Sequence, residues 1–457
     1  MTAPRVCGDT GNATGSQILD KAVEFRINSR MHTVKLATAI ALTLWVAPGW
    51  DVPFRLVSIE PLPSIDPVAC AWPAGGLTSA VLYAQSPGQD SETLDQAPVR
   101  AIEDDRATFS AVALDPVRNE IVLQDQNLFQ IHVYDRLAAA PTASISTPKR
   151  IIEGPRTEIE FNVGLYVDPR NGEIYSLSND TSDTLIVFGP EARGNVPPVR
   201  KLHTPHGTYG IALDEVNSEM FLSVEHDNAI VVYRKSAKGE DAPIRLIQGE
   251  RTSLADPHGI AVDPTRNRLF VANHGSTHLV REGLGPSSMS NWPLTRGYAV
   301  PGSGRSLPPS IAVYERTVQG DSRPLRVITG PATRLNWPGQ IFLDAAHDEL
   351  FVANDGDHSL LVFSGTASGN AAPLRIIKGA NTGLANPTGV WVDVAHEEVL
   401  ASNMGNHSAT VYARTATGDV APRRTIRAAP AGKKALAIGN PGAVAYDRTR
   451  DQLLVPN

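Results

Sequence analysis

Histidine and carboxylate side chains gather in one stretch of the chain. Six of the 12 histidines lie between residues 203 and 278. Imidazole and carboxylate groups together suit zinc, whose bound water can act as a nucleophile or base near neutral pH. The stretch therefore supplies candidate ligands for a divalent metal, Zn or Ca: His206, Glu225, His226, His258 and His274. Their spacing matches no recognised ligand motif, and the alternative interpretation is that they are surface histidines in polar loops.

Signatures of other chemistries are missing from the sequence. No G-x-S-x-G, Walker or Rossmann glycine pattern accompanies a suitable strand and helix, so serine nucleophile chemistry has no support. The formal net charge is -7, which argues against a phosphate backbone as the main partner, because nucleic-acid binding needs a basic surface. We therefore expect no nucleic-acid partner.

A repeating pattern predicts the elements that hold the histidines. A Pro-x-Arg sequence recurs along the chain, and its arginines are Arg100, Arg150, Arg200, Arg245, Arg326, Arg375 and Arg424. Three short apolar runs accompany it, ending in Asp, in a polar residue such as Asn, and in Tyr or Phe. Because these runs are rich in Val, Ile, Leu and Phe and are broken by Pro and Gly, they indicate strands. Four strands per repeat predict an all-β fold, a seven-bladed β-propeller with four antiparallel strands per blade.

The two ends of the repeat region predict how the ring closes. The region begins with the third and fourth strands of a unit, at 80–84 and 98–102, and ends with the first and second, at 443–447 and 453–457. The two halves make one blade, so the last blade would be closed by N-terminal strands. Without that closure the ring would keep an open edge, which is a liability for a sheet. Removing residues 76–102 would then abolish cooperative unfolding.

Two segments carry a resemblance to known repeats. The sequences PHGIAVDPTRNRLFVAN (257–273) and VANDGDHSLLVF (352–363) resemble NHL repeats and the related YVTN-type repeats of bacterial propellers, over about residues 76–457. The resemblance implies that the Asp-ended strand lines the channel and that the Pro-x-Arg strand is outermost, where proline is tolerated. The repeated arginines are therefore interpreted as structural, each reaching a neighbouring carboxylate or carbonyl. The rival interpretation is an arginine girdle for an anionic partner.

The fourth repeat departs from the others. An insertion at 276–308 separates its second strand from its third, and long loops of this kind are usually functional or disordered. We interpret the insertion as a lid or wall over the channel mouth, with a plain surface excursion as the alternative. The candidates for the binding face are Tyr209, Asp227, Trp292, Tyr298 and Asp355.

Residues 1–75 differ from the repeats and are interpreted as an N-terminal extension to the propeller domain at 76–457. An apolar run at 36–47 is too short to span a bilayer as a helix, but it matches the core of a signal segment at 31–50. We therefore expect a secreted or periplasmic protein, with a cytoplasmic one as the alternative. The two cysteines, Cys7 and Cys70, lie in this part, so no disulfide framework is expected in the repeats. We expect a monomer without a transmembrane helix.

Two functional classes fit these observations. The first is a non-catalytic binding or scaffold propeller that presents its loop face to a protein, peptide or glycan, which suits the regularity of the repeats. The alternative is a metal-dependent hydrolase or lyase, because the propellers that the resemblance brings in include lactonases and lyases. Its site would lie at the channel mouth of blades 3 and 4. Only one of the first channel-facing positions is a histidine, His258, so a symmetric ring of histidines is absent. We favour the binding class, although the fold alone does not decide between them.

Overall fold

The computed structural model describes residues 104–436, except 142–143, 180, 282–297 and 301, together with 445–447, 449 and 452–454. The N-terminal extension, the signal segment, the closing strands at 80–84 and 98–102, Arg100 and Trp292 lie outside these residues. Within the described ranges the secondary structure consists of strands and short 3-10 turns. Accordingly, none of these residues belongs to a helix long and apolar enough to cross a membrane.

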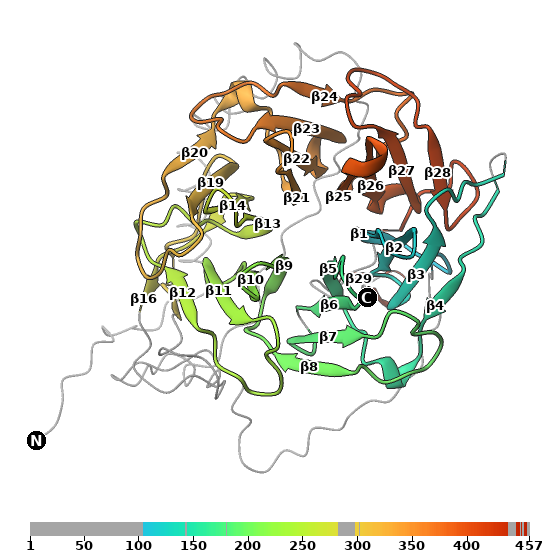
Figure 1. Ribbon diagram of the computed structural model, residues 1–457, viewed down its shortest axis with the longest axis horizontal. Helices are drawn as coiled ribbons and strands as arrows, with labels where there is room; N and C mark the ends of the chain where they lie inside the picture. The colour runs from blue at the N-terminus through green and yellow to red at the C-terminus, as the bar shows by residue number, and fades with distance from the viewer. Residues whose placement is uncertain are drawn as a thin grey trace, which may run out of the picture. The chain divides into compact units, whose positions relative to one another are not determined.

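Four-stranded antiparallel sheets stand around a central channel, as the repeats predict (Figure 1). Blades 1 to 3, each from the inner to the outer strand, are β1 (Phe109–Asp115), β2 (Glu120–Asp125), β3 (Gln130–Asp135) and β4 (Arg150–Ile152); β5 (Asn162–Val167), β6 (Ile174–Ser178), β7 (Thr184–Phe188) and β8 (Arg200–His203); and β9 (Thr208–Asp214), β10 (Glu219–Val224), β11 (Ala229–Arg234) and β12 (Arg245–Gln248).

Blades 4 to 6 repeat the same order. They are β13 (Pro257–Asp263), β14 (Arg268–Asn273), β19 (Ser310–Glu315) and β20 (Arg326–Thr329); β21 (Pro338–Asp344), β22 (Glu349–Asn354), β23 (Ser359–Ser364) and β24 (Arg375–Ile377); and β25 (Pro387–Asp393), β26 (Glu398–Asn403), β27 (Ser408–Ala413) and β28 (Arg424–Arg427). Every outer strand begins at the arginine of a Pro-x-Arg sequence. The predicted all-β propeller of four-stranded blades is therefore confirmed.

The described part of the chain has six such blades rather than seven. Blade 6 packs directly against blade 1: Thr388 Oγ1 on β25 donates to the carbonyl of Ser110 on β1 at 2.7 Å. Val112 and Leu123 of blade 1 share one apolar cluster with Val411 of blade 6. Blades 6 and 1 are therefore direct neighbours, where a seventh blade completed by N-terminal strands was predicted to lie between them. The seventh repeat contributes β29 (Ala445–Asp447) and β30 (Gln452–Leu454), which pair with each other.

A carboxylate held between two arginines joins neighbouring blades at the outer side of the ring. Glu349 of blade 5 accepts two hydrogen bonds of 2.7 Å from Arg375 of its own blade. It accepts a third, also of 2.7 Å, from Arg414 of blade 6. Two other blade contacts repeat the arrangement around Glu219 and Glu398. The outer-strand arginines Arg245, Arg375 and Arg424 thus contact carboxylates, whereas Arg326 donates to the carbonyls of Gly365 and Ala367.

The contact between blades 4 and 5 reverses the charges. Arg268 occupies the position of the shared glutamate and bonds Asp263 of its own blade at 2.6 Å. It also donates to the carbonyl of Gly365 in blade 5 at 2.8 Å, and it pairs with Asp348. Gly365 stands where blade 6 has Arg414, so the cation at this contact comes from Arg268 and the carboxylates from Asp263 and Asp348.

We predict that Glu349→Gln lowers the free energy of unfolding by about 1–3 kcal/mol, since it leaves two largely buried guanidinium groups without their carboxylate. Denaturant unfolding monitored by circular dichroism measures the difference. Glu191→Gln is the matched control, because Glu191 pairs with Arg118 at 2.9 Å with its side chain 70% exposed. That substitution should leave the midpoint unchanged.

The difference in unfolding free energy between the wild type and Glu349→Gln should also depend on pH. Hydrogen bonds from Arg375 hold the pKa of Glu349 below its usual 4.5, more than burial raises it. A carboxylate whose pKa falls on folding stabilises the protein above its unfolded pKa, and that contribution is lost as the pH falls through the folded pKa. The deficit of Glu349→Gln should therefore be constant near neutral pH and shrink below 4.5. A deficit that persisted through strong acid would argue against the ion pair as its cause.

The direct contact of blades 6 and 1 predicts that a chain lacking residues 76–102 still unfolds in one cooperative transition, with a midpoint close to that of the full chain. Parallel thermal melts followed by circular dichroism compare the two chains. A broad, non-cooperative melt of the shortened chain would show instead that N-terminal strands complete the ring.

Candidate functional site

A backbone contact that recurs in blades 3 to 6 builds one face of the ring, here called the loop face. In each blade a residue of the loop before the inner strand accepts, through its carbonyl, the N–H of the residue that follows the second strand. The donor and acceptor pairs are Glu225 and Gly207 at 2.8 Å, His274 and Asp256 at 3.0 Å, Asp355 and Trp337 at 3.1 Å, and Met404 and Asn386 at 3.0 Å. Equivalent positions in adjacent blades therefore bring Glu225, His274 and Asp355 to the same face.

Close packing of the inner strands fixes the next position. A Cβ on Gly210 would lie 2.1 Å from the carbonyl oxygen of His258, and one on Gly259 would lie 2.2 Å from that of Gly339. Only glycine permits such an approach of two backbones. The register of β13 shifts between Pro257 and Ile260, which sets His258 at the start of the channel. The position of this imidazole is thus determined by backbone contacts on both sides.

His258 is held through both ring nitrogens. Its Nε2 lies 3.1 Å from Glu225 Oε2, and its Nδ1 lies 3.0 Å from the carbonyl oxygen and 3.5 Å from Oδ1 of Asp256. Asn179 of blade 2 donates to the other oxygen of Glu225 at 3.1 Å. The ring of Tyr209 lies over the imidazole, with centroids 4.1 Å apart. Residues from three blades therefore orient one histidine.

His274 stacks on His258, with ring centroids 3.4 Å apart and planes inclined by 19°. Its Nδ1 lies 3.9 Å from Asp256 Oδ2. Its Nε2 is buried and makes no hydrogen bond of ordinary geometry in the described part of the chain, although the backbone carbonyl of Pro338 lies close enough to raise the pKa of the ring. The ring of Trp337 lies on its other side at 5.0 Å. A buried polar atom without such a bond inside an otherwise bonded cluster is unusual and calls for an explanation.

The two histidines differ in their pKa values. Burial lowers the pKa of His258, but the hydrogen bond to Glu225 and the charges of Glu225 and Asp256 outweigh it, so the net direction is upward. Burial and the neighbouring charge of His258 lower the pKa of His274 to about 2. His258 therefore binds a proton more readily than His274, whose pKa lies far below neutral.

The acidic groups around them carry unfavourable charge. Burial raises the pKa of Asp256, and the nearby charge of Glu225 raises it further. Burial also raises the pKa of Asp355, against a hydrogen bond from Asn386. The phenol of Tyr209 shifts upward in pKa because of burial and of the charges of Glu225, Asp355 and Asp256. The cluster is thus a concentration of negative charge that a cation would relieve.

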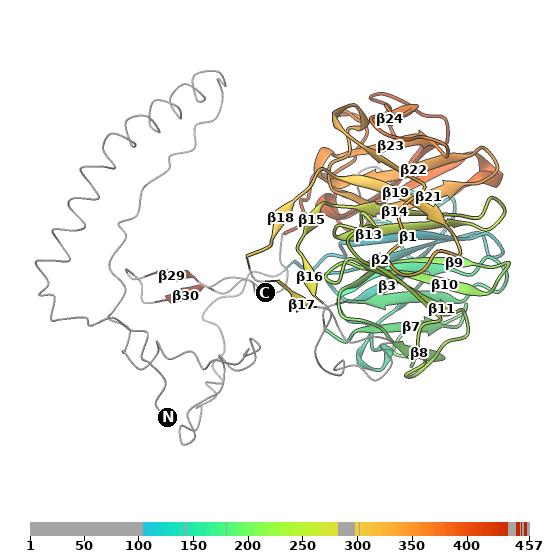
Figure 2. The same cartoon turned by 90° about the vertical axis from the view of Figure 1, so that its left-hand side faces the viewer.

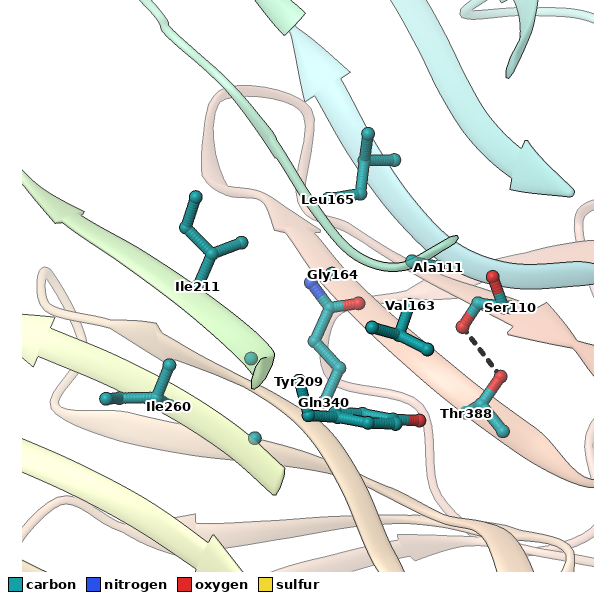
Figure 3. Close-up of a pocket in the computed structure, with 12 residues that line it drawn as sticks. Ser110, Ala111, Val163, Gly164, Leu165, Tyr209, Ile211, Ile260, Gln340 and Thr388 are labelled. Carbon is teal, nitrogen blue, oxygen red and sulfur yellow. Dashed lines mark hydrogen bonds between the residues drawn. The ribbon is translucent and has the colours of Figure 1, made fainter. Parts of the chain in front are cut away.

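The channel beneath the mouth is nearly filled. An axial cavity of ≈ 20 Å³ remains among Ser110, Val163, Tyr209 and Thr388, and the side chain of Gln340 extends into it (Figure 3). That space holds about one water molecule. Further along the inner strands the rings of Tyr166, Phe342 and Trp391 meet across the channel. An organic ligand must therefore lie on the mouth rather than within the described channel.

The predicted metal ligands separate into two groups. Glu225, His258 and His274 come together as described. His206 and His226 form their own pair, with ring centroids 5.2 Å apart. His206 bonds Asp183 at 3.1 Å, and His226 reaches Glu225 only from the half-exposed outer side, at 3.5 Å. The structure does not bring His206 to the channel.

The predicted binding-face residues also differ in their placement. Tyr209 and Asp355 line the mouth, whereas Asp227 is buried in the turn after β10, where its carbonyl accepts from Gln248. Tyr298 lies in β17 (Tyr298–Ala299), which pairs with β16 (Val280–Arg281). Trp292 lies outside the described residues.

The described part of the blade-4 insertion is the stem of a hairpin. Besides β16 and β17, it contains β15 (Ser276–Thr277) paired with β18 (Arg305–Ser306). Figure 2 shows these strands on one side of the ring. Asn228 of blade 3 donates to Thr277 Oγ1 at 3.1 Å, which ties the stem to the neighbouring blade. Because residues 282–297 lie outside the described ranges, the interpretation as a lid stays a prediction.

Sequence reasoning missed Asp256 and Trp337. Both precede the proline of an L-x-x-P sequence in the loop before an inner strand, and Asn386 occupies the same place in blade 6. All three have positive φ, at 57°, 51° and 46°. Asn and Asp tolerate that conformation, but a bulky side chain rarely adopts it. An alignment of the repeats with each other would have shown Trp337 as the departure.

Comparisons with known proteins assign no function. No protein family and no curated protein matches the chain. A functionally unknown protein from Desulfotomaculum acetoxidans DSM 771 is 12% identical with a TM-score of 0.44, over 69% of this chain and 85% of that chain. Hydrazine synthase from Kuenenia stuttgartiensis is 13% identical with a TM-score of 0.45, over 71% of this chain and 100% of that chain. The fold is a β-propeller. The likeness to NHL and YVTN-type repeats stays a resemblance in sequence.

We predict that Gly210→Ala destabilises the protein by about 1–3 kcal/mol, because the new methyl group must displace the backbone carrying His258. Gly189→Ala is the control, since a Cβ there meets no atom within 4 Å. Urea unfolding of both variants measures the difference. Equal stability of the two would contradict the close approach of β9 and β13.

Proposed function

We propose that the protein is a non-catalytic binding propeller whose mouth, on blades 3 to 5, takes a polypeptide ligand with a basic side chain. Trp337 carries this proposal. Its side chain belongs to a residue that is 58% exposed, beside the channel and next to His274. Exposed tryptophans at such positions are typical of the anchors that dominate protein interfaces.

The backbone of Trp337 supports a functional role. Its φ of 51° lies in the left-handed region, at a position where blades 3, 4 and 6 have Gly207, Asp256 and Asn386. Glycine adopts this conformation freely and Asn or Asp tolerates it, but any other residue adopts it at a cost of about 1–2 kcal/mol. Strained residues of this kind cluster at ligand sites, where their side chain has a task that scaffold residues do not have. Because Trp337 is largely exposed, packing in the core does not explain why a tryptophan stands at this position.

Charge indicates which ligand fits. Asp256 and Asp355 stand near Trp337 with pKa values raised by burial, so a cation placed there gains attraction from both. A lysine or arginine side chain over an indole also gains a cation–π interaction. Of the basic side chains near this rim, Lys378 is paired with Asp357, and Arg334 precedes Trp337 in the same loop. The mouth therefore suits a basic peptide segment better than an anionic partner.

A metal-dependent hydrolase or lyase is the second candidate. The cluster of Glu225, His258 and His274 favours it, because imidazole and carboxylate groups are what such chemistry uses. Catalytic pockets, however, usually bury most of a small substrate in several hundred cubic ångströms. The axial cavity of ≈ 20 Å³ does not provide that space. The small volume of this cavity therefore supports recognition over catalysis.

We predict that Trp337→Asn abolishes ligand binding while stabilising the fold by about 0.5–1 kcal/mol, since Asn adopts the left-handed conformation at lower cost. Peptide and glycan arrays probed with the full chain, in the presence of a chelator, identify ligands. The wild type should select peptides rich in Lys and Arg, and Trp337→Asn should lose at least about tenfold in affinity, consistent with a truncated anchor.

The control variant is Val216→Ala, an exposed apolar residue in the turn after β9, at the opposite end of the blade. It should bind as the wild type does. Selection of neutral glycans alone, or peptide binding that does not respond to Trp337→Asn, would refute the proposed ligand and site.

A further inference from the structure

We infer that Asp256, His258 and His274 form a binding site for one divalent transition-metal ion of the zinc class. One nitrogen or oxygen atom from each residue lies within 4.8 Å of the corresponding atoms of the other two. All three belong to blade 4, on the loop before β13, at the start of β13 and just after β14. The inference goes beyond the proposed function, because metal binding is measured without any peptide.

The distances suit a tetrahedral ion. Zinc bonds of 2.0–2.1 Å at tetrahedral angles place neighbouring ligand atoms about 3.3 Å apart. Asp256 Oδ1 lies 3.5 Å from His258 Nδ1, and Asp256 Oδ2 lies 3.9 Å from His274 Nδ1. The two imidazoles are stacked with planes inclined by 19°, so at least one ring must rotate before both rings can direct an in-plane lone pair at one ion. The backbone that carries the three residues is already fixed by the contacts at Gly210 and Gly259.

A second layer of contacts sets the protonation state of His258. Glu225 lies 3.1 Å from Nε2, so this carboxylate accepts the Nε2–H, and Nδ1 becomes a metal ligand once it gives up the proton that it donates to the carbonyl of Asp256. Asn179 in turn bonds Glu225. Histidine ligands of metals almost always donate their other ring N–H to a carboxylate or carbonyl in this way. The chain thus supplies the orienting partner as well as the ligands.

The ligand set discriminates between metals. Calcium takes six to eight oxygen ligands, whereas this cluster offers two imidazole nitrogens and one carboxylate. Imidazole and carboxylate donors suit zinc and its neighbours in the first transition series. Of the two metals considered from the sequence, the geometry therefore points to Zn rather than Ca. Three protein ligands leave a fourth coordination position for water or an external donor.

A metal-free arrangement is the competing explanation. His258 as an imidazolium donates from Nε2 to Glu225 and from Nδ1 to the carbonyl of Asp256, which satisfies both nitrogens. This arrangement leaves the buried Nε2 of His274 without a hydrogen bond of ordinary geometry. It also leaves His274 stacked on a cation of the same ring type. The two explanations make opposite predictions for added Zn²⁺.

The experiment uses the full chain, stripped of metal with a chelator and dialysed. Titration with Zn²⁺ against a chromophoric chelator measures affinity and stoichiometry, and Co²⁺ reports nitrogen ligation and tetrahedral geometry through its visible absorption. We expect one equivalent of Zn²⁺, a tetrahedral Co²⁺ spectrum, and no binding of Ca²⁺ at matched concentration.

Three variants locate the site. Asp256→Asn keeps the turn, as Asn386 does in blade 6, and should weaken Zn²⁺ binding at least about 100-fold by removing a ligand. Glu225→Gln should weaken it about 10–100-fold through the lost orienting contact. His206→Phe is the control and should bind as the wild type does.

Failure of the wild type to bind Zn²⁺ or Co²⁺ would overturn the inference, whatever the variants do. Equal affinity in the wild type and Asp256→Asn would also overturn it, provided that both melt alike. Peptide binding in the presence of chelator is a separate result, so a metal-free protein that still binds peptides refutes this site and leaves the proposed function standing.

Discussion

A carboxylate between two guanidinium groups is the contact on which the ring depends. Glu349 receives Arg375 from its own blade and Arg414 from the next, and Glu219 and Glu398 are held in the same way. Because each glutamate bonds arginines from two blades, it holds the two neighbouring sheets together and limits their rotation against each other. Between blades 4 and 5 Arg268 replaces the glutamate, and it pairs with Asp263 and Asp348 instead.

Because these glutamate–arginine contacts hold the blades together, the side chains of the loop face are free to vary. The inner strands are packed closely at Gly210 and Gly259, and the axial cavity among them is small. Backbone hydrogen bonds between each loop and the second strand of its blade fix the backbone positions at the mouth. A rigid scaffold of this kind can change a side chain without moving its neighbours. The same two positions carry Asp256 and His274 in blade 4 and Trp337 and Asp355 in blade 5. The metal proposal uses these two positions in blade 4, and the binding proposal uses the same two positions in blade 5 together with Asp256.

Much of the fold was readable in advance, and less of the site. The repeated strand endings predicted four-stranded blades and the outer position of Pro-x-Arg, because turn residues and proline act locally. The clustering of Glu225, His258 and His274 was also predicted. Asp256 and Trp337 were not, since their importance lies in a positive φ and in their neighbours across the blade. His206 was included because it lies just before an inner strand, as His258 does, yet its ring bonds Asp183 instead of joining the cluster.

The sequence by itself determined the repeating unit. Its strands, its turns and the residues that end each strand depend on contacts between residues close in the chain. The tertiary structure decided how many described blades meet in the ring, because closure depends on the packing of blade 6 against blade 1, residues nearly 300 positions apart such as Ser110 and Thr388. It also decided which polar residues share one mouth. Side chains from separate blades become neighbours only when the ring closes, and their burial, which sets the charge of His258 and His274, exists only there.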